Sequence, residues 1–186
     1  MPDPPERTWI FDGVRPPTFD DAAWHEAGHA VARLVLGFEV EEMWVTYAPQ
    51  PDGNPHRGET TCKANQFFYI LRNLNRPEYD RRLVLVTLAG DLVDERRRVA
   101  HGAHKAEILC RLGGRQPKDA ADGQVLAELF SNAQLLSIFE QQCTQARRLI
   151  DLHWLAVERL AGHLLASPGH RLRDLRARDL ADLERP

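Results

Sequence analysis

The stretch "DDAAWHEAGHAVARLVLG", residues 20–37, places two histidines and a glutamate inside a run of alanine, valine and leucine. Positions four residues apart lie on one face of an α-helix, so His25 and His29 would point the same way. Glu26 would be rotated by ~100° from His25 around the helix axis. The order His-Glu-x-x-His therefore indicates either a metal site or a polar patch on an ordinary helix.

Capping residues indicate where this helix begins and ends. Thr18 and Asp21 have the spacing of a capping box, and Asp20 and Asp21 also complement the positive end of a helix dipole. Gly37 follows the apolar run, as expected for a residue past a helix C-terminus. We expect a helix from about Asp20 to Leu36.

The metal interpretation rests on the chemistry of the three side chains. Neutral imidazoles one helical turn apart can share one zinc ion. A carboxylate one residue further on reaches a water bound to that ion, which is the position of a general base. We therefore expect His25 and His29 to be metal ligands and Glu26 to be the general base. The alternative is that both histidines are solvated or hydrogen-bonded core residues.

Composition and charge exclude several classes of protein. The net charge of −3 gives no broad attraction to nucleic acid or acidic membranes. Three scattered cysteines indicate reduced thiols rather than a disulfide framework. No apolar run approaches the ~20 residues of a membrane span, and the N-terminus lacks the pattern of a signal peptide. We expect a cytoplasmic protein with neither nucleic acid nor membrane as its partner.

The remaining sequence predicts a mostly α fold with a small β-hairpin or sheet, an α+β class. Residues 39–62 combine β-type side chains with a turn-rich segment, which is typical of a hairpin or small sheet. The helical period dominates from Pro77 onward. Residues 132–166 predict one long helix, or two with a bend, whose apolar face would pack on its own domain or on a neighbouring copy, so the sequence fits either a monomer or an oligomer.

The domain organisation follows from these patterns. Prolines and charges make residues 1–17 a flexible N-terminal arm, and residues 18–186 form a single domain. Pro168 and Gly169 interrupt the helical pattern. Regularly spaced leucines after this break predict that residues 168–186 form a C-terminal helical tail.

A catalytic zinc site with two histidines needs a third protein ligand, and its fourth position is left to water. No further histidine follows at the metzincin spacing, so we expect a distant carboxylate. The candidates are Asp91, Asp94, Glu95, Asp119 and Asp122. For Asp94 and Glu95 the pattern favours a solvated helix face paired with the arginines that follow. Asp119 also suits a helix N-cap.

A family resemblance adds to this interpretation. "HEAGHAV", on a helix followed by a glycine and a short sheet, resembles the peptidase domain of FtsH-type ATP-dependent zinc proteases. "LVTLAGDLVDE" is similar to that family's second helix, in which a glycine permits close packing on the zinc helix. Gly90 would have that place.

The family's third zinc ligand is an aspartate at the start of a later helix, where this chain has "GGRQPKDAADGQVLAELF". The resemblance implies Asp122, with Asp119 as second choice. This chain departs from the family by having Gly123, where a large apolar residue usually follows the aspartate.

The resemblance implies a zincin-like helix bundle and a zinc-dependent metalloendopeptidase in which Glu26 takes a proton from water and passes it to the leaving amine. The substrate would be a peptide or unfolded protein segment. It would pair with an exposed edge of the strand "VEEMWVTY", with Val45 and Thr46 at the centre. The chain lacks the Gly-x-x-x-x-Gly-Lys-Ser/Thr loop of an ATPase. We therefore expect a stand-alone peptidase, acting alone or with an ATPase or a dedicated protein partner on another chain.

Three alternatives stay open at this point. The chain could be a non-catalytic metal-binding protein of the same fold, although an intact Glu26 argues against a purely structural metal. It could be a regulatory protease that cleaves a repressor, as ImmA-like proteins do. Finally, it could be an all-helical interaction protein whose histidines have no common role.

Overall fold

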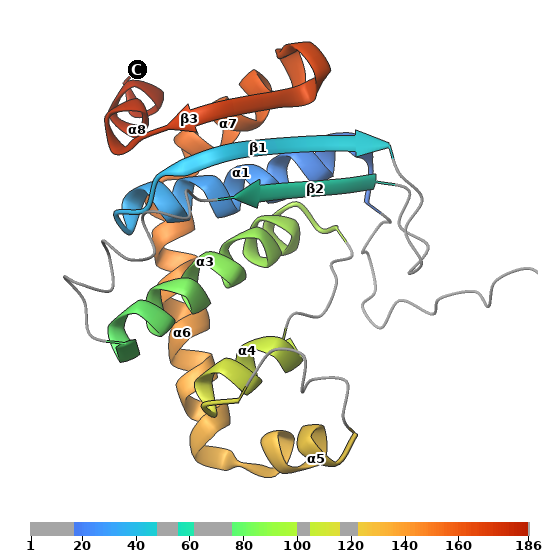
Figure 1. Ribbon diagram of the computed structural model, residues 1–186, viewed down its shortest axis with the longest axis vertical. Coiled ribbons are helices and arrows are strands. Elements are labelled where there is room, and N and C mark those ends of the chain that lie inside the picture. The colour runs from blue at the N-terminus through green and yellow to red at the C-terminus, as the bar shows by residue number, and fades with distance from the viewer. Residues whose placement is uncertain (1–16, 48–55, 62–75, 100–104, 116–122, 186) are drawn as a thin grey trace, which may run out of the picture.

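The structure is a computed structural model that describes residues 17–47, 56–61, 76–99, 105–115 and 123–185. Its helices are α1 (Phe19–Val35), α3 (Arg76–Arg96), α4 (Lys105–Leu112), α5 (Gly123–Ser131), α6 (Ala133–Leu152), α7 (Trp154–Ala166) and α8 (Ala177–Glu184). Its strands are β1 (Val40–Tyr47), β2 (His56–Thr61) and β3 (Arg171–Leu175). The fold is mostly helical with a small antiparallel sheet, as the sequence predicts (Figure 1).

Helix α1 has the capping that its sequence predicts. Thr18 is the N-cap, and its Oγ1 accepts a hydrogen bond from the backbone N–H of Asp21 at 3.3 Å. Asp21 Oδ2 accepts in return from the backbone N–H of Thr18 at 2.8 Å, which completes the capping box. Gly37 follows the helix with a φ of +84°, a conformation that glycine adopts without strain.

The sheet has the order β2-β1-β3, so β1 is its central strand. Strand β2 pairs antiparallel with β1 from Glu42 to Tyr47, and β3 pairs with the opposite side of β1 from Val40 to Trp44. The expectation that β1 offers an exposed edge is therefore wrong along its first five residues. In the described part of the chain the edge strands are β2 and β3.

The C-terminal tail differs from the expected helix in its first half. Residues Arg171–Leu175 form strand β3, and only residues from Ala177 onward form the helix α8. Leucines three residues apart fit a helix in isolation, but pairing with β1 satisfies the backbone and overrides this local pattern. Arg171 and Arg173 reach the Glu42 carboxylate of β1 at 2.9 and 2.7 Å, which adds ion pairs across the two strands.

The long C-terminal helical region is two helices rather than one. Helices α6 and α7 are separated at His153, whose ring contacts the Glu184 carboxylate of α8. Of the two expected arrangements, two helices with a bend is therefore confirmed. Within the described ranges, no helix is both long enough and apolar enough to cross a membrane.

Helix α1 lies at the centre of the fold and contacts α3, α7 and the strands β1 and β2 (Figure 1). Its buried face consists largely of small residues, including Ala23, Ala27 and Ala30. A Cβ atom on Gly28 would lie 2.8 Å from Val93 Cγ2 and 3.0 Å from the Ala89 carbonyl oxygen of α3. The absence of that side chain lets α1 and α3 approach closely, which brings the polar residues of both helices together.

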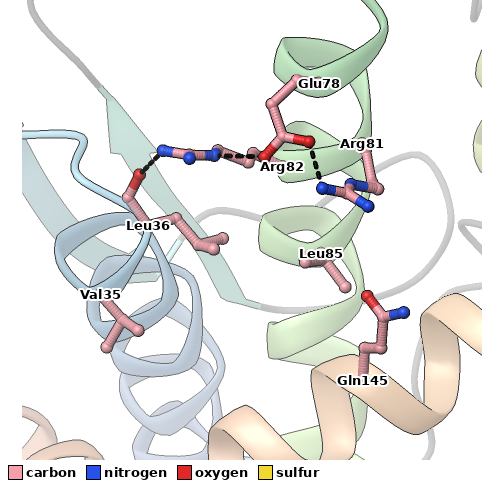
Figure 2. Close-up of a pocket in the computed structure, with 7 residues that line it drawn as sticks. All are labelled: Val35, Leu36, Glu78, Arg81, Arg82, Leu85 and Gln145. Carbon is pink, nitrogen blue, oxygen red and sulfur yellow. Dashed lines mark hydrogen bonds and ion pairs between the residues drawn. The ribbon is translucent and has the colours of Figure 1, made fainter. Parts of the chain in front are cut away.

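A pocket of about 250 Å³ lies between the C-terminal end of α1, the start of α3 and α6 (Figure 2). Arg82 donates hydrogen bonds to the Glu78 carboxylate and, at 2.8 Å, to the Leu36 carbonyl oxygen just past α1. Arg81 also contacts Glu78. These contacts join α3 to the end of α1, and none of the three His-Glu-x-x-His residues lines the pocket.

Candidate metal centre

The two histidine rings of α1 converge against α3. Their Nε2 atoms lie 3.0 Å apart, and the rings are nearly perpendicular, with an interplanar angle of 88°. The i, i+4 spacing thus places both imidazoles side by side, as the sequence predicts.

The second nitrogen of each ring contacts an acceptor on α3. Nδ1 of His29 lies 2.7 Å from the Val86 carbonyl oxygen, which can only accept, so Nδ1 carries a hydrogen and donates it. Nδ1 of His25 lies 2.8 Å from Asp94 Oδ2 and donates to that carboxylate. In the neutral form of both rings, each Nε2 therefore presents a lone pair to the other. Two lone pairs at this distance repel each other, so the arrangement suits either a proton on one Nε2 or a cation bound by both.

Glycine in α3 makes room for the two rings. A Cβ atom on Gly90 would lie 2.6 Å from Nε2 of His29 and 2.8 Å from Cε1 of His25. Any larger residue would displace the rings. Gly90 therefore has the packing role that the resemblance implies, because it lets α3 contact α1 at His25 and His29.

Two buried carboxylates of α3 flank His25. Asp91 and Asp94 are each only 6% exposed. One ligand atom from each of His25, Asp91 and Asp94 can be chosen so that all three lie within 4.8 Å of one another, which is a group that could hold a metal ion. The expectation that Asp94 lies on a solvated helix face is wrong, because close packing of α3 on α1 turns it toward His25. Glu95 does lie on the solvated face, where it pairs with Arg147 at 2.9 Å.

The charge around His25 favours a bound cation. Burial by itself disfavours the charged ring, but the charge and hydrogen bond of Asp94 outweigh it and raise the pKa of His25 from 6.5 to about 9. The carboxylates of Glu26 and Asp91 act in the same direction. At neutral pH without metal, His25 is therefore protonated, and its Nε2–H donates to Nε2 of His29. This proton would compete with a metal ion, because both would use the lone pair of Nε2 of His25.

Glu26 is buried between α1 and strand β2 and is 5% exposed. The Thr60 hydroxyl donates to Glu26 Oε2 at 2.6 Å, and Oε1 lies beside Gly58, where a Cβ atom would come within 2.7 Å. Burial raises the pKa of the Glu26 carboxyl, although the charges of His25 and Arg33 and the Thr60 hydrogen bond oppose this rise. A carboxylate with a raised pKa is a stronger base, which suits proton abstraction.

The remaining expected site residues fall into two groups. Asp119 and Asp122 lie outside the described residues, so the structure does not place either relative to the histidines. Val45 and Thr46 lie in the central strand β1, where Val45 is buried and Thr46 is exposed, and they pair with Gly58 and Arg57 of β2. On the other side of β1 the pairing with β3 runs from Val40 to Trp44 and does not extend to Val45 and Thr46.

Sequence reasoning missed the residues that support the site. Asp94 stands four residues after Gly90, so it shares the helix face that packs on α1, and this spacing could have identified it. Thr60 and Gly58 alternate along β2 and share one face of the strand. Their contact with Glu26 depends on the way the sheet packs over α1, which no local pattern predicts. No protein-family model and no curated protein matches this chain.

Proposed function

We propose that this chain is a zinc-dependent metalloendopeptidase in which His25 and His29 bind the metal and Glu26 is the general base. One observation carries the proposal: the two Nε2 atoms converge to 3.0 Å while both Nδ1 atoms donate to acceptors on α3. Histidine ligands of zinc typically donate their other nitrogen to a carboxylate or a backbone carbonyl, and the two rings have one of each.

The donor atoms favour zinc over harder cations. Imidazole nitrogens suit zinc, whereas calcium and magnesium prefer sites built from oxygen ligands alone. The family resemblance implies Asp122, or else Asp119, as the third ligand. Asp91 and Asp94 are the candidates within the described residues.

Each side chain of the proposed site would have a separate role in hydrolysis. When bound, the zinc ion would supply Lewis acidity and lower the pKa of a bound water. Thr60 fixes Glu26 Oε2, which leaves Oε1 to take a proton from the attacking water and to return it to the leaving amine. Asp94 holds the His25 ring in its orientation. The burial of Glu26 keeps bulk water away from the base.

An extended peptide or unfolded segment would bind along the outer edge of β2. In the described part of the chain, this strand pairs only with β1, and its residues Gly58 and Thr60 lie over Glu26. Backbone pairing with such an edge binds a peptide regardless of most of its side chains. Val45 and Thr46 would support this strand from its inner neighbour. An ATPase or a dedicated protein partner on another chain would supply unfolded substrate in the cytoplasm.

Glu26→Gln tests the proposal. The purified variant should bind as much zinc as the unmodified protein but should lose hydrolysis of an unfolded protein such as casein, followed by the release of labelled peptides. Glu41→Gln makes the same chemical change at an exposed position of β1 and should leave both properties unchanged. Full hydrolysis by Glu26→Gln would remove the general-base assignment.

The second candidate is a regulatory or non-catalytic metal-binding protein of the same fold. This alternative rests on the burial of Glu26 and its hydrogen bond to Thr60, because such contacts suit a structural carboxyl as well as a base. The same assay separates the two. Zinc bound at one equivalent with no hydrolysis of unfolded proteins would favour the regulatory candidate, which would act on one dedicated partner.

A further inference from the structure

We propose that the Arg33 guanidinium of α1 binds a carboxylate group of the substrate, either an acidic side chain or the free C-terminus of a peptide. This inference rests on the proposed function and names the substrate class of the same site. The preferred substrate would be a peptide that carries a carboxylate close to the bond that is cleaved.

Arg33 lies beside the proposed base. It stands seven residues after Glu26, which is nearly two helical turns, so both side chains leave α1 on the same face. Both also contact Thr60 of β2. The Thr60 hydroxyl donates to Glu26 Oε2 at 2.6 Å, and Arg33 Nη2 donates to the Thr60 carbonyl oxygen at 3.2 Å. The positive charge of Arg33 lowers the pKa of the Glu26 carboxyl, which agrees with this proximity. A group bound to Arg33 would therefore lie within about one or two residues of Glu26, measured along an extended peptide.

The guanidinium of Arg33 has buried donors without acceptors. In the part of the chain that the structure describes, its Nε and Nη1 atoms are buried and have no hydrogen-bond partner. Its Nη2 atom donates to a carbonyl oxygen, which carries no net charge. Burial of a charged group is costly unless the group is paired and hydrogen-bonded. The unpaired donors therefore indicate a place where an anion from outside the described residues binds.

Two other arginines that contact α1 or the residues just after it do have carboxylate partners. Arg97 Nη2 donates to Asp21 Oδ1 at 2.9 Å, and Arg82 Nε donates to Glu78 Oε1 at 2.9 Å. In these two structural contacts the charge of the arginine is neutralised by the protein itself. Arg33 differs from both, which separates it from arginines that only join the helices.

A carboxylate suits the unpaired donors of Arg33. Hydrogen bonds between guanidinium and carboxylate groups are charge-assisted and are about twice as strong as neutral ones. Burial of Nε and Nη1 excludes competing water and would strengthen the pair further. Arg33 as a whole is partly exposed, so it does not belong to the fully buried core. A peptide that binds along the outer edge of β2 passes Thr60 and would bring its own carboxylate to this arginine.

Peptide binding tests the proposal without depending on hydrolysis. Three fluorescein-labelled alanine–serine peptides would be titrated with Glu26→Gln in the presence of zinc and followed by fluorescence anisotropy. The first peptide has one central glutamate and an amidated C-terminus. The second has glutamine at that position, and the third differs from the second only in its free C-terminus. We expect the first or the third peptide to bind about tenfold or more tightly than the second, as for a hydrogen bond to a charged group. Tighter binding of the first would identify an acidic side chain as the ligand, and tighter binding of the third a C-terminal carboxylate.

Substitution of Arg33 tests whether this residue causes the preference. Arg33→Gln, combined with Glu26→Gln, should bind all three peptides equally. Arg148→Gln removes an exposed arginine of α6 as the matched control and should retain the preference. If Arg33→Gln fails to fold, Arg33→Lys keeps the positive charge and should show a reduced preference. Equal affinities for the three peptides with Arg33 intact would overturn the proposal, as would an unchanged preference in either variant of Arg33.

The result can be separated from that of the proposed function. Hydrolysis of casein by the unmodified protein, combined with equal affinities for the three peptides, would refute the role of Arg33 and leave the peptidase standing. A preference that depends on Arg33, in a protein that hydrolyses no unfolded substrate, would refute the peptidase and leave the carboxylate site.

Discussion

Asp94 of α3 accepts a 2.8 Å hydrogen bond from Nδ1 of His25 on α1, across 69 residues of sequence. The bond fixes the ring so that Nε2 faces Nε2 of His29. Asp94 therefore determines the geometry of the candidate metal centre without occupying the position between the two nitrogens.

Asp94→Asn should weaken zinc binding by about 10- to 100-fold, because the amide is a poorer acceptor for the imidazole N–H than the carboxylate. The affinity should be measured with a competing chelator at a pH above 9, where the His25 proton no longer competes with the metal. Glu95→Gln changes the neighbouring, exposed carboxylate that pairs with Arg147 and should retain full affinity. Equal affinities for the two variants would show that Asp94 does not position the ring.

Zinc binding should release about one proton from His25 at neutral pH. The pKa of His25 in the metal-free protein is about 9, so the ring is charged at pH 7 and must become neutral to bind zinc. The affinity should therefore rise about tenfold per pH unit up to about 9 and then level off. Calorimetric titrations in buffers with different ionisation enthalpies measure the proton release directly. No released proton at pH 7 would contradict the charged ring.

The same pKa predicts how the stability of the metal-free protein depends on pH. The pKa of His25 is higher in the folded chain, about 9, than its ordinary value of 6.5. The contact between charged His25 and Asp94 therefore stabilises the fold fully below pH 6.5, and this contribution is lost as the pH rises through about 9. Thermal unfolding with a chelator present should show a declining midpoint over that interval. The decline should be smaller in Asp94→Asn.

The sequence predicts local features of this protein well and long-range contacts poorly. The capping box at Thr18 and the hairpin follow from short-range chemistry, and both are present. Strand β3 was expected to be helical because its leucine spacing fits a helix. Its pairing with β1 makes it a strand instead. Asp94 was expected on the surface because three arginines follow it, but the close approach of α3 to α1 buries it. Such contacts between distant segments leave no local periodic pattern.

Gly90→Ala should disrupt the metal centre. The added methyl group would lie 2.6 Å from Nε2 of His29, and the ring cannot move without losing its hydrogen bond to the Val86 carbonyl oxygen. We expect loss of zinc binding and a decrease of about 1–3 kcal/mol in the free energy of unfolding, as for other overpacked sites.

Gly162→Ala is the matched control for this change. A Cβ atom on Gly162 meets no atom within 4 Å, and the residue is exposed on α7. Removing a glycine from a helix interior should increase the free energy of unfolding by about 0.5–1 kcal/mol. Urea denaturation and zinc titration of both variants check these outcomes. Retained zinc binding in Gly90→Ala would contradict the close contact of α3 with the histidines.

Thr60→Val should shift the pH dependence of hydrolysis. The hydrogen bond from Thr60 lowers the pKa of Glu26 and opposes the effect of burial, so its removal should raise that pKa further. The acidic limb of the kcat/KM profile should then move to higher pH, because Glu26 must be ionised to accept a proton. The buried Glu26 carboxylate also loses its hydrogen-bond donor, which should lower the free energy of unfolding by about 1–3 kcal/mol.

Thr61→Val is the matched control. The Thr61 hydroxyl donates to the Glu42 carbonyl oxygen instead, so this change should leave the pH profile of hydrolysis unchanged. An acidic limb that stays in place in Thr60→Val would show that Glu26 does not act as the base.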